Sequence, residues 1–165
     1  IVAPLERLAE ALVHWAQTHR DSSLADLEQA VLTAVRDALP ALLGAVLPLS
    51  TRALDPGYCR APAACPTCGQ RGRVQSWRRR RLLTVCGRLE WERPWFTCAA
   101  CRHGWSPVDT TLGVRPRTRL SAGVQQWLAE LGAATDFAEA QEWLERLTGL
   151  HVAPETVRQM LKRTN

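Results

Sequence analysis

Residues 64–105 read "ACPTCGQRGRVQSWRRRRLLTVCGRLEWERPWFTCAACRHGW" and place a Cys-x-x-Cys motif near each end of a segment rich in arginine and tryptophan. Each motif turns two thiolates inward from one tight loop, and two such loops close a tetrahedral site of the kind that structural zinc prefers. We therefore predict one structural zinc ion per chain, held by Cys65, Cys68, Cys98 and Cys101.

Two other chemistries also use paired cysteines. Thioredoxin-like redox chemistry accounts for one Cys-x-x-Cys motif but not for two, and no βαβ pattern surrounds either motif. An iron–sulfur cluster also uses four cysteines and stays an alternative metal centre. Cys59 and Cys86 have no partner at ligand spacing, and His103 is an alternative ligand to Cys101.

The 29 residues between the two motifs fit a β-hairpin. Residues 73–85 and 88–98 have strand character and are joined around Gly87. Because side chains alternate between the two faces of a strand, Arg78 and Arg80 should share one face, and Arg79 and Arg81 the other. The same rule places Trp91, Arg93 and Trp95 on one face of the second strand, where Pro94 indicates an edge.

Positive charge is concentrated in the middle of the chain. Residues 52–119 hold fourteen Arg against four acidic residues, whereas residues 1–51 and 120–165 are each slightly acidic, within a formal net charge of +5. A block this basic favours a polyanion, most often nucleic acid. We predict that it binds double-stranded DNA through Arg78, Arg79, Arg80, Arg81 and Arg93.

The first fifty residues are predicted to form two helices. One covers residues 4–19, and the second begins after Ser23, which with Asp26 resembles a capping box. Pro40 and Gly44 should kink or end this helix. The apolar run at 38–49 is too short to span a bilayer, so we interpret it as packing on the first helix or as a homodimer contact. With no signal peptide at the start, we expect no membrane partner and a cytoplasmic, nucleoid-associated protein.

The last third is predicted to form three helices, at 121–133, at 137–148 after an Asp136 cap, and at 154–163 with Pro154 in its first turn. The second and third helices, joined by the turn at 148–152, fit a helix-turn-helix, whose second helix enters the major groove. A three-helix packing unit without a DNA role is the alternative. The predicted DNA-contacting residues of the third helix are Glu155, Thr156, Arg158, Gln159, Lys162 and Arg163.

The order "CPTCG", the hairpin, "SPVDTTLGV" and "LSAGVQQWLAELGAATDFAEAQEWLERLTGLHVAPETVRQ" resembles the N-terminal half of bacterial insertion-sequence transposases of the ISKra type, over roughly residues 60–160. The resemblance implies that this region recognises transposon-end DNA, while a following RNase H-like domain with a metal-binding DDE set carries out transposition by cutting and joining DNA. It also implies a structural role for Asp109. The chain begins at Ile1 and ends at Asn165, so we expect a piece of a longer protein that has no catalytic activity alone.

These observations predict a mainly α protein with a small β element. We expect an N-terminal helical pair at 1–50, a four-cysteine zinc ribbon with flanking loops at 51–119, and a helix-turn-helix unit at 120–165. The predicted function is sequence-specific DNA binding by the N-terminal region of a transposase. The alternatives are a zinc-ribbon module that binds proteins and a domesticated, transposase-derived regulator.

Overall fold

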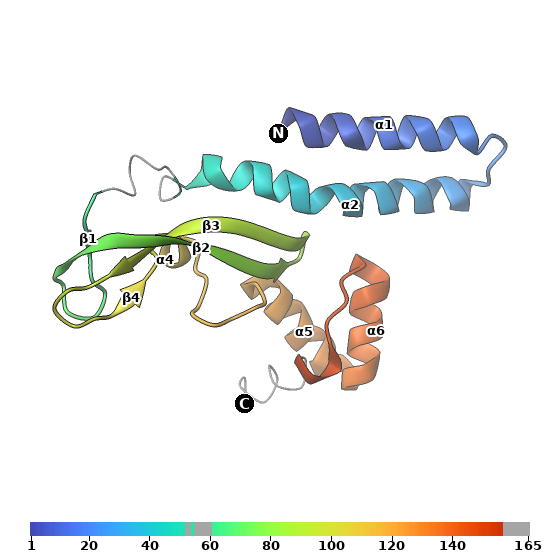
Figure 1. Cartoon of the computed structure of the whole chain (residues 1–165). Helices are drawn as coiled ribbons and strands as arrows, with labels where there is room; N and C mark the ends of the chain where they lie inside the picture. The colour runs from blue at the N-terminus through green and yellow to red at the C-terminus, as the bar shows by residue number, and fades with distance from the viewer. Residues whose placement is uncertain (52–53, 55–60, 157–165) are drawn as a thin grey trace.

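The computed structural model describes residues 1–51, 54 and 61–156. About half of the chain is helical, and the strands form one small antiparallel sheet (Figure 1). A pair of long helices lies along one side of the sheet, and a shorter pair lies on the other side (Figure 1). The prediction of a mainly helical protein with a small β element is confirmed.

The N-terminal hairpin consists of α1 (Val2–Thr18) and α2 (Leu24–Ser50). The predicted capping box is present at the start of α2. The Ser23 hydroxyl accepts the Asp26 N–H at 3.2 Å, and the Asp26 carboxylate accepts the Ser23 N–H at 3.2 Å. These two bonds satisfy N–H groups that have no partner within the first turn.

The expectation that Pro40 and Gly44 end or kink the second helix is wrong as to its end, because α2 continues through both Pro40 and Pro48. Each proline removes one backbone hydrogen bond, but packing on β3 compensates in this half of the helix. Leu47 is buried in a cluster that includes Leu89 of the sheet. The Pro40 ring lies so close to Gly87 that a Cβ there would meet it at 2.6 Å.

The sheet has the order β1 (Ala63–Ala64), β2 (Arg71–Thr84), β3 (Gly87–Thr97) and β4 (Gly104–Trp105). The predicted hairpin is therefore present as β2 and β3, and each cysteine motif adds one short outer strand. Pro94 lies on an inner strand, but β4 pairs only with Phe96 and Thr97, so no strand among the described residues pairs with the outer edge of β3 at Pro94.

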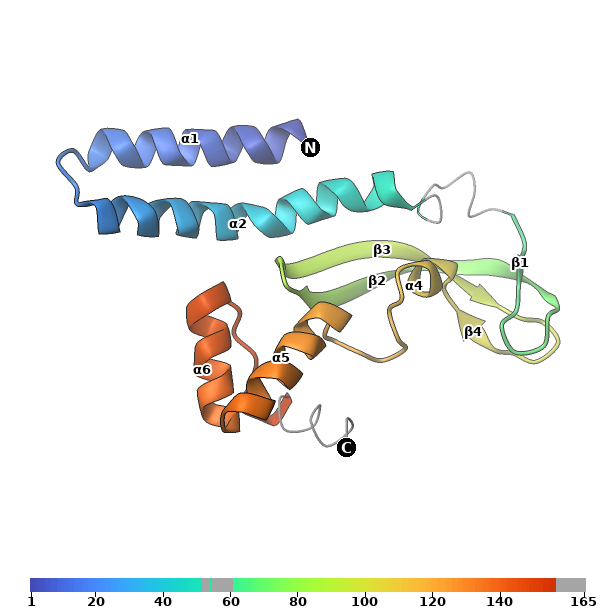
Figure 2. The same ribbon diagram turned by 180° about the vertical axis from the view of Figure 1, so that it is seen from behind.

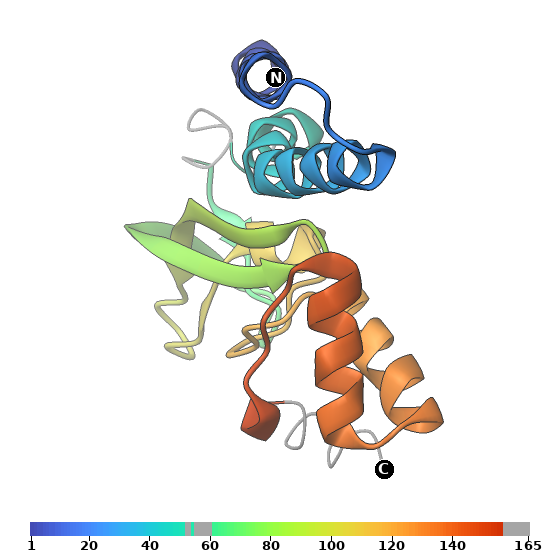
Figure 3. The same ribbon diagram turned by 90° about the vertical axis from the view of Figure 1, so that its right-hand side faces the viewer.

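The two faces of the hairpin pack against different helices. Leu82 points into a cluster with Leu47 and Trp91, whereas its neighbour Leu83 packs against the cluster around Val124. Figure 3 shows these two layers on opposite sides of the strands. Of the flanking loops expected within 51–119, the one that follows the second cysteine motif contains the short helix α4 (Pro107–Thr111), whose Val108 joins the cluster of Leu47 and Trp91. Five residues are too few to give a helical pattern in the sequence.

The C-terminal pair consists of α5 (Ala122–Ala134) and α6 (Phe137–Thr148), close to the predicted bounds. Asp136 caps α6 as predicted, because its carboxylate accepts the N–H groups of Ala138 and Glu139. Gly149 then ends the helix with φ 71°, a conformation that glycine adopts without strain. Residues 154–156 are helical, and the rest of the predicted third helix lies outside the described residues.

Candidate metal centre and basic surface

The two cysteine motifs fold into matching loops. In the first, the Gly69 N–H donates to the Cys65 carbonyl at 2.9 Å, and the Cys65 N–H donates to the Gln70 carbonyl at 2.8 Å. In the second, Arg102 and His103 make the equivalent bonds with Cys98, both at 2.9 Å. Gly69 and Arg102 also adopt the same left-handed conformation, with φ 73° and 58°. The two loops therefore present their cysteines in the same way, one before β2 and one after β3, at the end of the hairpin opposite the β2–β3 turn.

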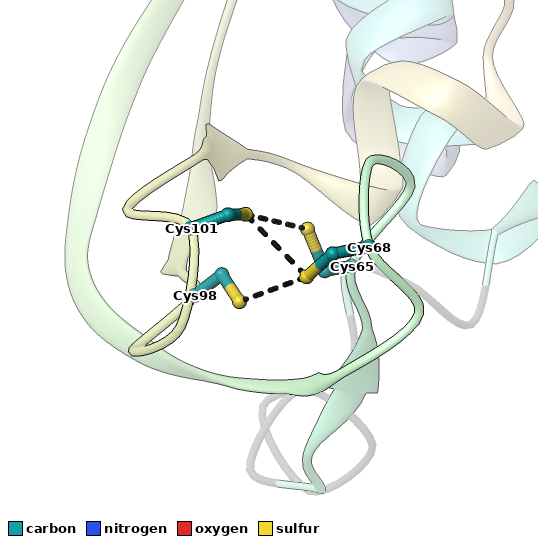
Figure 4. A group of neighbouring side chains, drawn as sticks. All are labelled: Cys65, Cys68, Cys98 and Cys101. Atoms are coloured by element: carbon teal, nitrogen blue, oxygen red, sulfur yellow. Dashed lines mark hydrogen bonds between the residues drawn. The ribbon is translucent and has the colours of Figure 1, made fainter.

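The four thiol groups converge between the loops (Figure 4). The Sγ atoms of Cys65 and Cys101 are 3.6 Å apart, and Cys68 Sγ lies 3.5 Å from both Cys98 and Cys101. All four lie within 4.8 Å of one another, so this group can hold a metal ion. His103 is not a member of the group, and its ring lies against Trp105 instead.

The cysteines differ in exposure, since Cys65 and Cys98 are buried beside Phe96, whereas Cys68 and Cys101 are exposed. Burial raises the pKa of the Cys65 thiol, but the N–H groups of Thr67 and Cys68 and the neighbouring thiols lower the pKa more, to about 6. The Gln70 N–H lowers the pKa of Cys68, but Cys101, Cys98 and burial raise it to about 12.

The opposite shifts of neighbouring thiols have a simple electrostatic cause. One thiolate forms readily among the N–H donors, and its negative charge opposes the ionisation of the next. A bound cation removes this repulsion, because it attracts all four thiolates at once. Cys86, which lies in the β2–β3 turn, is absent from the group, and Cys59 lies outside the described residues.

The arginine run at 78–81 alternates between the faces of β2 as predicted, but its side chains have partners within the protein. Arg79 and Arg81 both pair with Glu90 on the adjacent strand, Arg79 with an Nε–Oε1 distance of 3.1 Å. On the other face, the Arg78 guanidinium stacks on Trp95, 4.5 Å from the ring centre. Arg80 donates to the Arg115 carbonyl at 3.1 Å. The run therefore stabilises the hairpin and the loop beside it.

Arg93 does not belong in the predicted set of DNA contacts, because it is 6% exposed. Its Nε lies 2.8 Å from Oδ1 of Asp109 on α4, in a buried ion pair. Burial lowers the pKa of Arg93 while Asp109 raises it, and burial raises the pKa of Asp109 while Arg93 lowers it. The period-two rule placed Arg93 on the correct face, but the sequence did not reveal that α4 covers this face.

Other arginines offer positive charge that no acidic side chain neutralises. Within the described part of the basic block, residues 61–119, six exposed arginines have no ion pair, no aromatic ring beneath them and no side-chain hydrogen bond, and none of them was among the predicted DNA contacts. The basic composition was the only signal for them, because they do not form a run. Arg71 and Arg73 lie at the start of β2, and Arg88 lies just after the hairpin turn. Arg102 lies in the second cysteine loop, and Arg117 and Arg119 lie in the loop before α5.

The predicted base-reading residues are only partly described. Glu155 is exposed and Thr156 is half-buried in the helical turn at 154–156. Arg158, Gln159, Lys162 and Arg163 lie outside the described residues. The turn before them packs on the α5–α6 core through Leu150 and Val152.

Helix α2 is long and apolar enough to cross a membrane, judged by length and composition. The apolar run at 38–49, which was judged too short to span a bilayer, covers only the C-terminal part of this helix. Core helices and signal sequences share these two properties, so the length and composition of α2 assign no location to the chain.

A scan against protein-family models and a search of the curated proteins found no match.

Proposed function

We propose that the four-cysteine group binds one structural zinc ion. A tetrahedral zinc–thiolate site with bonds of about 2.3 Å places its sulfur atoms about 3.8 Å apart, and three of the sulfur pairs here are 3.5 to 3.6 Å apart. Four protein ligands leave no open position for a substrate, which supports a structural role. Bound there, the metal would tie the start of β2 to the end of β3.

We further propose that this chain is the double-stranded DNA-binding region of a transposase of the ISKra type. The observation that carries this proposal is the group of exposed arginines without an acidic partner, which lie on and beside the cysteine loops and in the loop before α5. Figure 2 shows the cysteine loops, this loop and the α5–α6 pair all on the side of the molecule away from α1. The acidic helical hairpin, α1 and α2, therefore lies on the other side from the basic elements. A DNA phosphate backbone could then contact the arginines without approaching the acidic residues of the helices.

Under this proposal, the basic elements and the helix-turn-helix divide the work. Arg71, Arg73 and Arg102 contact phosphates beside the metal centre, and the loop arginines extend the contact toward α5. The helix that begins at residue 154 reads bases from the major groove. No catalytic step is assigned to this chain, because Asp109 serves an ion pair and Asp136 a helix cap.

The test is a matched pair of charge variants of the zinc-loaded chain. We expect Arg71→Gln/Arg73→Gln to weaken binding to random duplex DNA and to reduce the salt slope by about 2, since each lost phosphate contact removes roughly 0.9. The control is Arg79→Gln/Arg81→Gln, which removes the same charge from side chains paired with Glu90. Fluorescence anisotropy between about 50 and 200 mM salt measures both slopes.

Two results would contradict the proposal. One is the absence of DNA affinity at low salt in a chain that holds its metal. The other is an equal loss of salt slope in both double variants, which would mean that net charge alone sets the affinity for DNA.

The alternative role, a module that docks other proteins, is favoured by the apolar side chains exposed on α1 and α2. Apolar docking would weaken little as salt rises.

A further inference from the structure

Most of the exposed apolar side chains of α2 form one stripe along its whole length, and Leu32 lies outside it. Its positions repeat every eleven residues, a spacing of about 3.67 residues per turn that keeps a stripe on one face of a helix over many turns. Six of the eight side chains are between 37% and 73% exposed, while α2 packs on α1 and β3 with its other faces. The stripe consists of Leu24, Leu27, Val31, Val35, Ala38, Leu42, Val46 and Leu49.

Helix α1 carries a stripe with the same spacing. Its members are all exposed. Leu5 and Ala16 lie eleven residues apart, and so do Val2 and Val13. Neither stripe contains a charged residue, although charged residues occur on both helices. The α1 stripe consists of Val2, Leu5, Ala9, Val13 and Ala16.

The two stripes lie on the same side of the hairpin. Leu12 and Trp15 of α1 face Ala30 and Ala34 of α2 across the groove between the helices. At 100° per residue, each stripe is rotated from the residues that face the other helix by about 90° in the same sense. Equal rotations in an antiparallel pair point to the same side. The result is an uncharged face two helices wide, opposite the groove that Trp15 lines.

We propose that this face binds the same face of a second copy of the chain. At about 1.5 Å per residue and 10 Å per helix width, it covers roughly 600 Å², which approaches the roughly 800 Å² that each partner buries in a stable interface. A two-fold dimer brings identical patches together, so each eleven-residue repeat meets one with the same period. The result is an intermolecular bundle of four helices.

The charge and packing of the hairpin favour a second copy over a membrane. Residues 1–51 hold three Arg against six acidic residues, whereas helices that lie on membrane surfaces carry Lys and Arg on their polar face. A spanning position for α2 would require Leu47 to leave its cluster with Leu82 and Trp91. A second copy covers the stripe and leaves that cluster intact.

The test is the oligomeric state of the full chain without DNA, measured by sedimentation equilibrium. We expect a dimer of 18.4 kDa chains, and a dissociation constant about 100-fold or more higher for Val31→Glu/Val35→Glu, because two charges would be buried at the centre of the interface. The control is Gln29→Glu/Thr33→Glu, which adds the same charge on the groove side of α2. The milder Val31→Ala/Val35→Ala should weaken the dimer without adding charge.

Circular dichroism and metal content show that each variant is folded. A wild-type chain that stays monomeric at every concentration overturns the proposal. So does a chain that is monomeric alone and sediments with anionic vesicles when these are added. A dimer that both stripe variants leave unchanged overturns the assignment to this face. The measurement contains no DNA, so its outcome is independent of the proposed DNA binding.

Discussion

Replacing Cys98 with serine should abolish metal binding and unfold the cysteine-loop end of the hairpin. Cys98 is fully buried, and its Sγ lies 3.5 Å from that of Cys68, so no water can take its place without opening the cluster. The remaining three thiolates would repel one another without a tightly held cation. Because metal-binding free energy becomes folding free energy, we expect a loss of about 3 kcal/mol or more in the free energy of unfolding.

The matched control for this prediction is Cys86→Ser. Cys86 is half-buried in the β2–β3 turn, at the end of the hairpin opposite the cysteine loops, and does not belong to the four-cysteine group. Metal analysis should find one metal ion per chain in the wild type and in Cys86→Ser, and none in Cys98→Ser. A chelator should lower the melting temperature of the first two only. A Cys98→Ser chain with full metal content and unchanged melting would contradict the assignment of this cysteine as a ligand.

The features that sequence analysis predicted correctly are those fixed by a few neighbouring residues. A Cys-x-x-Cys loop closes on itself, so its spacing is sufficient to indicate it. The Ser23 and Asp136 caps also depend on residues within one turn. The side-chain alternation of the hairpin follows from strand geometry alone, which explains why the faces of Arg78 and Arg79 were assigned correctly.

The features that were missed depend on contacts between distant segments. Nothing near Pro40 indicates that α2 continues, because the compensating contacts come from the β-hairpin, beginning at Gly87. In the same way, the ion pair of Arg93 requires Asp109, sixteen residues later and in a helix too short to predict. Composition alone could not tell that the arginines of the run have partners within the protein while the six dispersed ones of the described basic block have none.

The buried pair formed by Arg93 and Asp109 ties the hairpin to α4. Their side chains are only 8% and 14% exposed. Burial lowers the pKa of Arg93 and raises that of Asp109, so burial disfavours the charged form of each partner. A buried pair of this kind adds little net stability over apolar residues of the same size, but the loss of one partner leaves a buried charge uncompensated.

We therefore expect Asp109→Ala to lower the free energy of unfolding by about 3 to 5 kcal/mol, whereas Arg93→Met/Asp109→Leu should restore most of it because neither charge remains. The control is Glu92→Ala, which removes an exposed carboxylate from β3 and should change stability by about 0.5 kcal/mol or less. Urea unfolding of the metal-loaded chains measures all four proteins. If Asp109→Ala were no less stable than Glu92→Ala, the Arg93 guanidinium would have to reach solvent or another partner when Asp109 is absent.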